Sequence, residues 1–274
     1  MEWMKYIRQL TRNLKLLINH KQKKHMAILA LLLLAATASA VAATNRIVGG
    51  ADASIETYPA IVQIEYLNST VWSHGCGGNI LSPTYVLTAA HCVDEDDPMR
   101  IRAGTSYRET GGTVINVESY LIHPDYNKFV FLDADIALLR LEQALVYGPS
   151  IQPVAIYAQG IEVPDNSAVV FAGWGDTQPD GEPSTILQDV TVYTVSYKQC
   201  RRINGRDVTH NMLCAGVLGV GGKGVCFRYS GGPLYYGNVL VGLPSWGYGC
   251  ASKRYPGVNT KVSAFTDWIV ANAV

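Results

Sequence analysis

Short apolar or alternating runs, separated by turns, are the feature that most constrains the fold of this chain. Beyond residue 46 they cover residues 60–66 (AIVQIEY), 85–90 (YVLTAA), 167–175 (SAVVFAGWG), 187–195 (LQDVTVYTV) and 239–247 (VLVGLPSWG). Runs of this length between turn signals are typical of β-strands, and their spacing favours an antiparallel sandwich or barrel over alternating strands and helices. We therefore expect an all-β domain.

One helix is predicted, at the C-terminus. Ser263 is a candidate N-cap for it. One face of this helix, mostly apolar, would dock on the body, and it is formed by Phe265, Trp268, Ile269 and Asn272. A connection rich in proline and glycine, residues 148–166, is the predicted seam between two halves of the domain.

The N-terminal region has the pattern of a targeting segment. Residues 26–45 carry no charge, follow the basic run KQKKH, contain AILALLLLAA and end in small residues such as Ala38-Ser39-Ala40. This pattern predicts a cleaved signal peptide, residues 26–42, and a secreted, extracellular protein. The stretch is also about long enough to span a bilayer, so a membrane anchor is the alternative. Residues 1–25 form a basic lead that suits an amphipathic helix at a membrane surface, unless Met26 is the true start.

Charge and cysteine usage exclude several classes of function. The chain has 22 basic and 22 acidic side chains, so its net charge gives no support for a nucleic-acid partner. All six cysteines follow the targeting segment, and an even number in an exported chain predicts three disulfides, whose pairing the spacing leaves open. No cysteine pair has C-x-x-C spacing, so zinc binding and thioredoxin-like chemistry are not expected. We expect no metal and no cofactor. We expect the protein to be a monomer.

Seven short motifs, in this order along the chain, resemble those of the chymotrypsin-like, or trypsin, family of serine proteases: RIVGG (46–50), TAAHC (88–92), DADIALLRL (133–141), GWG (173–175), CFRYSGGP (226–233), SWGYGC (245–250) and YPGV (255–258). The resemblance covers residues 47–274. It implies two six-stranded antiparallel β-barrels with the active site between them and a C-terminal α-helix.

The chemistry of this family explains the residue types. A serine hydroxyl is a weak nucleophile, so a histidine must accept its proton and a carboxylate must orient that histidine. The resemblance assigns these roles to Ser230, His91 and Asp135. Asp133 is a rival for the carboxylate, but the family pattern places that residue directly before the isoleucine of D-I-A-L. The oxyanion hole would be formed by the backbone N–H groups of Arg228 and Ser230.

The resemblance also implies disulfides, a zymogen and an activation step. The implied pairs are Cys76 with Cys92, Cys200 with Cys214, and Cys226 with Cys250. Residues 43–46 would form a short activation peptide, and cleavage between Arg46 and Ile47 would free an ammonium group that, in the family, pairs with the aspartate before the nucleophile. Separately, Asn68-Ser69-Thr70 is an N-glycosylation sequon.

Two positions depart from the family run G-D-S-G-G-P. Arg228 replaces the glycine, whose backbone conformation is often costly for other residues, and its bulk would crowd the leaving-group side of the cleft. Tyr229 replaces the aspartate, which would leave the Ile47 ammonium unpaired at a cost of about 3–5 kcal/mol. Three interpretations remain: a weak or unusually activated protease, a catalytically silent homologue that acts by binding, or a sequence error at this place.

The predicted specificity pocket lacks a charge. Gly224 stands at its base, where trypsin-like members have aspartate, and the glycines Gly247 and Gly257 would leave its walls open. A cationic side chain would be desolvated there without a partner. Ser245 and Trp246 match the segment that pairs with the substrate backbone.

We therefore predict a secreted serine endopeptidase that cleaves protein or peptide substrates after bulky apolar residues. It would need an activating protease of tryptic specificity at Arg46, and protein protease inhibitors are further expected partners.

Overall fold

The computed structural model describes residues 9–13, 15, 47–93, 97–178 and 181–273. The chain divides into two units, residues 1–44 and 45–274. In the first unit, residues 9–13 and 15 are helical and exposed. The predicted signal peptide (26–42) and activation peptide (43–46) lie outside the described residues. Among the helices that are described, none has the length and apolar character needed to cross a bilayer.

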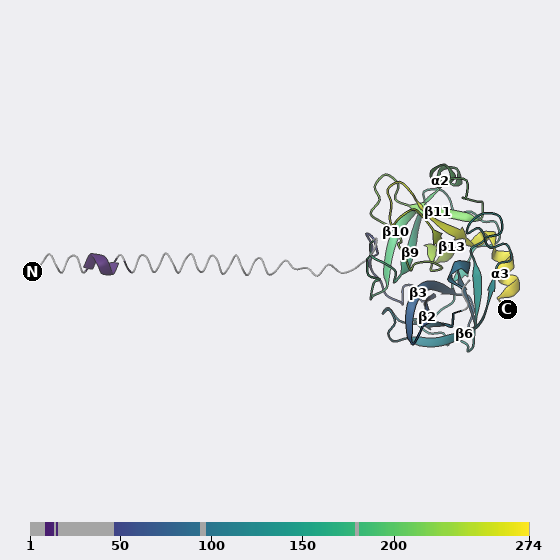
Figure 1. Ribbon diagram of the computed structural model, residues 1–274, viewed down its shortest axis with the longest axis horizontal. Coiled ribbons are helices and arrows are strands. Elements are labelled where there is room, and N and C mark those ends of the chain that lie inside the picture. The colour runs from purple at the N-terminus through teal and green to yellow at the C-terminus, as the bar shows by residue number, and fades with distance from the viewer. Residues whose placement is uncertain (1–8, 14, 16–46, 94–96, 179–180, 274) are drawn as a thin grey trace, which may run out of the picture. The chain divides into compact units, whose positions relative to one another are not determined.

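The first half of the second unit is a closed antiparallel barrel with the strand order β2-β3-β4-β7-β6-β5. Its strands are β2 (Ile61–Asn68), β3 (Val71–Ile80), β4 (Tyr85–Thr88), β5 (Met99–Ala103), β6 (Thr113–Ile122) and β7 (Ala137–Leu141). In Figure 1, strands β2, β3 and β6 lie together in the lower half of this unit. The strands predicted at residues 60–66 and 85–90 are thus present as β2 and β4.

Alternation along each strand explains why this sheet has two apolar faces. On β2, Val62 and Ile64 belong to the cluster inside the barrel, whereas Ile61 belongs to a cluster outside it. On β4, Val86 and Leu87 divide in the same way. Successive side chains on a strand point to opposite faces, so one strand serves both the barrel interior and the interface with the other half.

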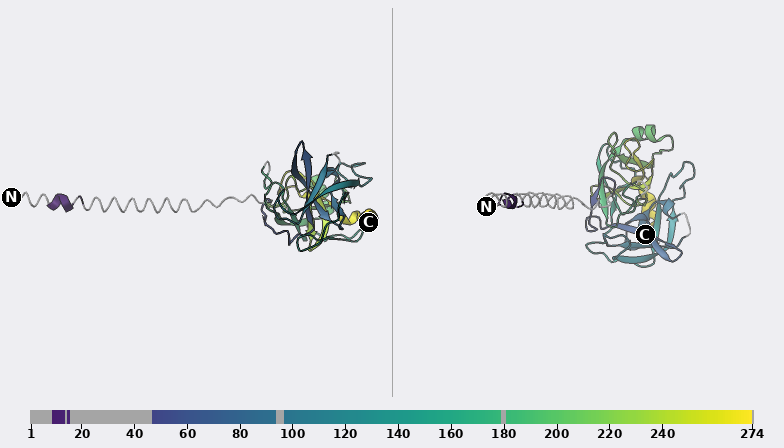
Figure 2. Two further views of the ribbon diagram at one scale, coloured as in Figure 1. Left: turned by 90° about the horizontal axis from the view of Figure 1, so that it is seen from below. Right: turned by 60° about the vertical axis from the view of Figure 1, so that its left-hand side comes forward.

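The second half is also a closed antiparallel barrel, with the strand order β10-β11-β14-β13-β12-β9. It is closed because the strands at the two ends of this order, β10 and β9, pair with each other. Its strands are β9 (Ala168–Gly173), β10 (Gln188–Val195), β11 (Met212–Gly216), β12 (Leu234–Tyr236), β13 (Val239–Trp246) and β14 (Gly257–Lys261). Two short strands join its edges: β1 (Ala51–Asp52) pairs with β10, and β8 (Ala155–Ile156) pairs with β13. Figure 2 shows the two groups of strands from two further directions. The predicted pair of six-stranded barrels is confirmed.

The apolar cluster that contains Ile61, outside the first barrel, joins both barrels to the C-terminal helix α3 (Thr266–Asn272). It combines Ile61 of the first barrel and Leu240 of the second with Phe265 and Ile269, which are both buried. The docking face was therefore predicted correctly, but the cap was wrong. Ser263 lies in the preceding 3₁₀ helix η2 (Val262–Ala264), and Phe265 occupies the N-cap position without a side-chain bond.

One further helix, α2 (Tyr197–Asn204), was not predicted from the sequence. Ser196 caps it, because its hydroxyl accepts a hydrogen bond from the Gln199 amide at 3.3 Å, and Gly205 ends it at a φ of 98°. Ser196 and Gln199 have the spacing of a capping box, and a glycine just past the last turn is a common helix stop. Both signals were in the sequence.

Three disulfides cross-link the fold, and they join the three pairs that the family resemblance implies. Cys76–Cys92 connects β3 to the 3₁₀ helix η1 (Ala90–Cys92), Cys200–Cys214 connects α2 to β11, and Cys226–Cys250 connects the two loops around the predicted pocket. No free cysteine occurs in the described part of the chain.

Candidate active site

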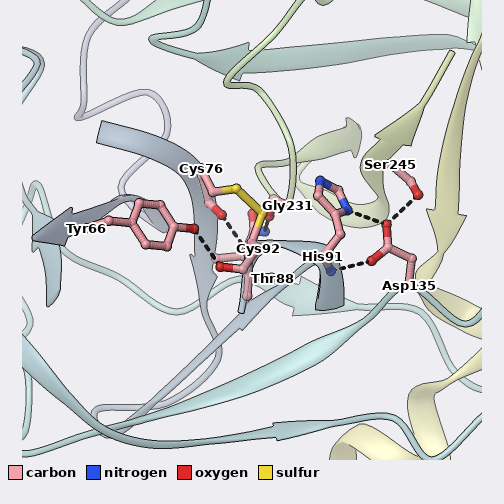
Figure 3. Close-up of a disulfide and its surroundings, with 10 residues drawn as sticks. Tyr66, Cys76, Thr88, His91, Cys92, Asp135, Gly231 and Ser245 are labelled. Atoms are coloured by element: carbon pink, nitrogen blue, oxygen red, sulfur yellow. Dashed lines mark hydrogen bonds and ion pairs between the residues drawn. A yellow bond between two sulfur atoms is a disulfide. The ribbon is translucent and has the colours of Figure 1, made fainter. Parts of the chain in front are cut away.

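Two hydrogen bonds hold His91 against Asp135. The His91 ring nitrogen Nδ1 lies 2.7 Å from Asp135 Oδ2, and the His91 backbone amide donates to Oδ1 at 2.9 Å (Figure 3). His91 belongs to η1, directly after β4, and its side chain is a quarter exposed while that of Asp135 is fully buried. The carboxylate thus fixes the ring orientation and leaves Nε2 as the nitrogen that faces away from it.

Asp135 receives further hydrogen bonds from the second barrel. The Ser245 hydroxyl of β13 donates to its Oδ2, and Thr260 Oγ1 of β14 donates to its backbone carbonyl at 2.7 Å. Figure 3 shows His91 and Ser245 on two sides of this carboxylate. Contacts from both barrels therefore hold Asp135 beside His91, and Ser245 takes part in a way that the sequence analysis did not foresee.

Asp133, the rival carboxylate, has different partners. Its Oδ1 accepts hydrogen bonds from Thr209 Oγ1 at 2.6 Å and from Asn211 Nδ2 at 3.2 Å. These contacts tie the loop before β7 to the second barrel.

The turn that carries Ser230 packs against the end of β4. The Ser230 carbonyl accepts from the Gly77 amide at 2.8 Å, and the Gly231 amide donates to the Pro244 carbonyl, next to Ser245, at 3.0 Å. Gly231 has a φ of 70°, and a Cβ there would lie 2.1 Å from Thr88 Oγ1. Only glycine allows this approach. The serine turn is thereby joined by contacts to the segment that leads into His91 and to the strand that contacts Asp135.

The two amides expected to form an oxyanion hole are those of Arg228 and Ser230, whose residues both line the cavity described below. Within the described part of the chain, neither the Arg228 nor the Ser230 amide donates a hydrogen bond. Arg228 has a φ of 65°, the left-handed conformation that favours glycine. Its side chain forms an ion pair with Asp176, which directly follows the GWG motif. The expected backbone cost at this position is thus present, and the guanidinium has a defined partner.

Tyr229 is buried in an apolar cluster that includes Ile47. Both side chains are almost fully inaccessible, at 2% and 0% exposed. The ring occupies the space over Gly173 and Gly175, where an added Cβ would come within 2.7 and 2.3 Å of ring atoms. Burial raises the pKa of the Tyr229 phenol, and the nearby Asp176 carboxylate raises it further. The hydroxyl has no hydrogen-bond partner among the described residues.

A cavity of about 370 Å³ lies beside Ser230 and contains the predicted pocket residues. Gly224, Gly247 and Gly257 line it together with Ser245 and Trp246. Its lining includes no aspartate or glutamate, and its charged members are Lys223 and Arg228. Added Cβ atoms at Gly247 and Gly257 would meet nothing closer than 3.7 and 3.6 Å, so both walls have room.

The activation junction, the glycosylation sequon and the cysteines beside His91 are the remaining predicted positions. Arg46 is not among the described residues, whereas Val48, two positions on, forms a β-bridge with Gly224 at the pocket base. Asn68 is exposed at the end of β2. Cys76, Cys92 and His91 have donor atoms within 4.8 Å of one another, but both sulfurs are held in a disulfide and cannot act as thiolate ligands for a metal.

Comparison with known proteins agrees with this geometry. The trypsin family model matches residues 47–269. The chain belongs to the trypsin family of serine proteases. It is 44% identical to "Trypsin, alkaline B" of Manduca sexta, over 89% of this chain and 98% of that protein. It is 42% identical to "Trypsin CFT-1" of Choristoneura fumiferana over the same shares, and 37% identical to "Vitellin-degrading protease" of Bombyx mori over 83% of this chain and 85% of that one.

Asp176 is the functional candidate that sequence reasoning missed. An acidic residue directly after GWG and an arginine in place of the usual glycine are both visible in the sequence. Their pairing is not, because 52 positions separate them.

Proposed function

We propose that residues 47–274 hydrolyse peptide bonds by acyl transfer, with Ser230 as nucleophile, His91 as general base and Asp135 as the residue that orients it. The two hydrogen bonds between His91 and Asp135 carry this proposal. They hold the imidazole in one tautomer, with Nδ1–H toward the carboxylate, so that Nε2 accepts the proton of the attacking hydroxyl. Asp135 then stabilises the imidazolium that forms.

The free amides of Arg228 and Ser230 complete the proposed mechanism. The carbonyl oxygen of the substrate gains negative charge as Ser230 attacks, and two N–H groups directed at it stabilise that charge. His91 next donates its proton to the leaving amine, and water repeats the sequence on the acyl-enzyme.

The decisive experiment uses a phosphonate probe that reacts only with an activated serine. Protein cleaved after Arg46 should be labelled at Ser230, and both S230A and H91A should abolish labelling. Folded, cleaved wild-type protein that takes no label would refute the proposal and favour the silent homologue. Retained native circular dichroism in each sample shows that loss of labelling is not loss of fold.

We further infer a preference for bulky apolar residues before the scissile bond, although two of the three relatives reported above are named trypsins. The support is a cavity with no carboxylate and with two cationic side chains in its lining. A substrate arginine there would lose its hydration without gaining a partner. Purified enzyme should hydrolyse phenylalanyl and leucyl anilides faster than arginyl ones, and the reverse order would contradict the pocket assignment.

The inferred apolar preference has a consequence for activation of the protein. An enzyme with this preference would not cleave after its own Arg46, so we propose a secreted zymogen that a protease of tryptic specificity activates. The three disulfides support an oxidising, extracellular location. Protein or peptide substrates, protein inhibitors and a monomeric state belong to the same proposal. Mass spectrometry of the secreted protein before and after trypsin treatment would test it, because the mature chain should begin at Ile47.

A further inference from the structure

Asp176 makes two hydrogen bonds to the loop that precedes the nucleophile. Its backbone amide donates to the Phe227 carbonyl at 2.9 Å, and its carboxylate forms an ion pair with the Arg228 guanidinium. One residue therefore holds two successive residues of this loop, one through the main chain and one through the side chain.

The carboxylate is well placed to hold Arg228. The Asp176 side chain is only 5% exposed, whereas that of Arg228 is 44% exposed, so the anion is fixed in the body and the cation reaches it from the surface. The approach is close, because a Cβ on Gly175 would lie 2.3 Å from the Phe227 carbonyl oxygen. A buried carboxylate is stable only with such a partner.

Arg228 needs this restraint more than a glycine would. Its φ of 65° lies in a region that side chains disfavour, so an unrestrained arginine would relax toward negative φ and rotate its amide. That amide is one of the two proposed oxyanion donors. A contact that fixes the Arg228 side chain thus also fixes the direction of its N–H.

We propose that Asp176 is a positioning residue for the oxyanion hole: its ion pair with Arg228 holds the left-handed backbone that directs the Arg228 amide into the site. The inference rests on the proposed function for its catalytic consequence, but the restraint itself is a property of the folded chain. Glycine adopts this left-handed conformation without strain, whereas Arg228 is held in it by the ion pair.

The first test measures the restraint without relying on activity. Native-state hydrogen exchange, followed by mass spectrometry of peptides covering residues 227–232, should show at least about tenfold faster exchange of the hydrogen-bonded Gly231 and Gly232 amides in D176N than in wild type. E162Q is the matched control, because it removes the carboxylate charge from another short ion pair, with Lys261, that lies away from the pocket. Unchanged exchange in D176N would overturn the inference.

The second test measures the catalytic consequence. Loss of a whole oxyanion donor costs about 10²- to 10³-fold in kcat, so a misdirected donor should cost less, about tenfold, with KM nearly unchanged. In the background R228G the same Asp176→Asn change should alter kcat by less than about twofold, because glycine adopts a φ of 65° without help. An equal loss in both backgrounds would show that Asp176 does not act through Arg228, and would overturn the inference.

The two tests separate this inference from the proposed function. Should wild-type protein take no phosphonate label while D176N still exchanges faster, the proposed function fails and the restraint stands. Where D176N does not fold, R228Q breaks the same pair from its exposed side and keeps a side chain at the strained position. R228Q should show the same faster exchange over residues 227–232, and wild-type exchange in R228Q would refute the restraint.

Discussion

Replacement of Tyr229 by phenylalanine should stabilise the protein. The Tyr229 hydroxyl is buried and has no hydrogen-bond partner among the described residues. A buried polar group left without a partner costs about 1–3 kcal/mol. Phenylalanine removes that cost and leaves a void smaller than a methyl group, which itself costs at most about 1 kcal/mol. The expected net gain is about 1 kcal/mol.

The measurement is the thermal and urea unfolding of uncleaved Y229F and wild type. A gain of about 1 kcal/mol raises the Tm of a domain of this size by about 2–4 °C. The slope of the urea transition should not change, because the ring stays in place over Gly173 and Gly175. A loss of stability greater than about 1 kcal/mol would show that the hydroxyl has a partner, and would refute this account of the cluster.

A companion variant, Y229D, tests whether an aspartate at residue 229, the usual residue of the family at this position, can pair with the new N-terminus. It removes a buried aromatic side chain, which costs about 3–5 kcal/mol, and buries a carboxylate near that of Asp176. Cleavage after Arg46 would supply the Ile47 ammonium as a partner, so Y229D should regain stability and phosphonate labelling on cleavage. Equal stability of Y229D before and after cleavage would mean that the new N-terminus does not reach residue 229.

Two other predictions concern the pH range and the pocket. Burial, with Arg108 and Arg228 nearby, lowers the pKa of His74 from 6.5 to about 3. The folded protein keeps His74 neutral, whereas the unfolded chain takes up a proton, so the free energy of unfolding should fall as the pH drops below 6.5, by up to about 1.4 kcal/mol per pH unit. In H74F this contribution is absent, so the urea midpoint should depend less on pH between pH 6 and 4. G257V should reduce kcat/KM for phenylalanyl anilides at least tenfold relative to alanyl ones, because its side chain would enter the cavity. G148V should leave that ratio unchanged, because a Cβ at residue 148 would meet nothing within 4 Å and the residue does not line the cavity.

Most of the fold could be predicted from the sequence because apolar and polar side chains alternate along a strand that has one buried face. Val62 and Ile64 alternate with polar or outward side chains in the way that a barrel strand requires, and the same pattern recurs in β9 and β10. The helical parts were predicted less well. Ser263 is a good capping residue by type, but it lies two residues before the observed N-cap, Phe265. Helix α2 is short and mostly polar, so the sequence shows no long apolar face for it.

The site divides along a similar line. The contact between His91 and Asp135 could be predicted because each residue lies in a motif that resembles those of the trypsin family. The contact between Ser245 and Asp135 and that between Asp176 and Arg228 could not, because each joins residues far apart in sequence through the packing of two barrels or two loops. A motif points to single residues, whereas an ion pair such as that of Asp176 with Arg228 becomes visible only when the three-dimensional positions of the two loops are known.

Taken one position at a time, Arg228 and Tyr229 both predict damage. In the folded chain their neighbours come from one short segment, residues 173–176. Gly173 and Gly175 leave the space that the Tyr229 ring fills, and Asp176 supplies the partner of Arg228. Because these contacts come from one stretch of four residues, a shift of this segment would disturb both replaced positions at once. The two replacements therefore form one structural unit with residues 173–176, and restoring only the family aspartate at residue 229 would leave Arg228 and Asp176 in a setting to which a second buried carboxylate adds repulsion.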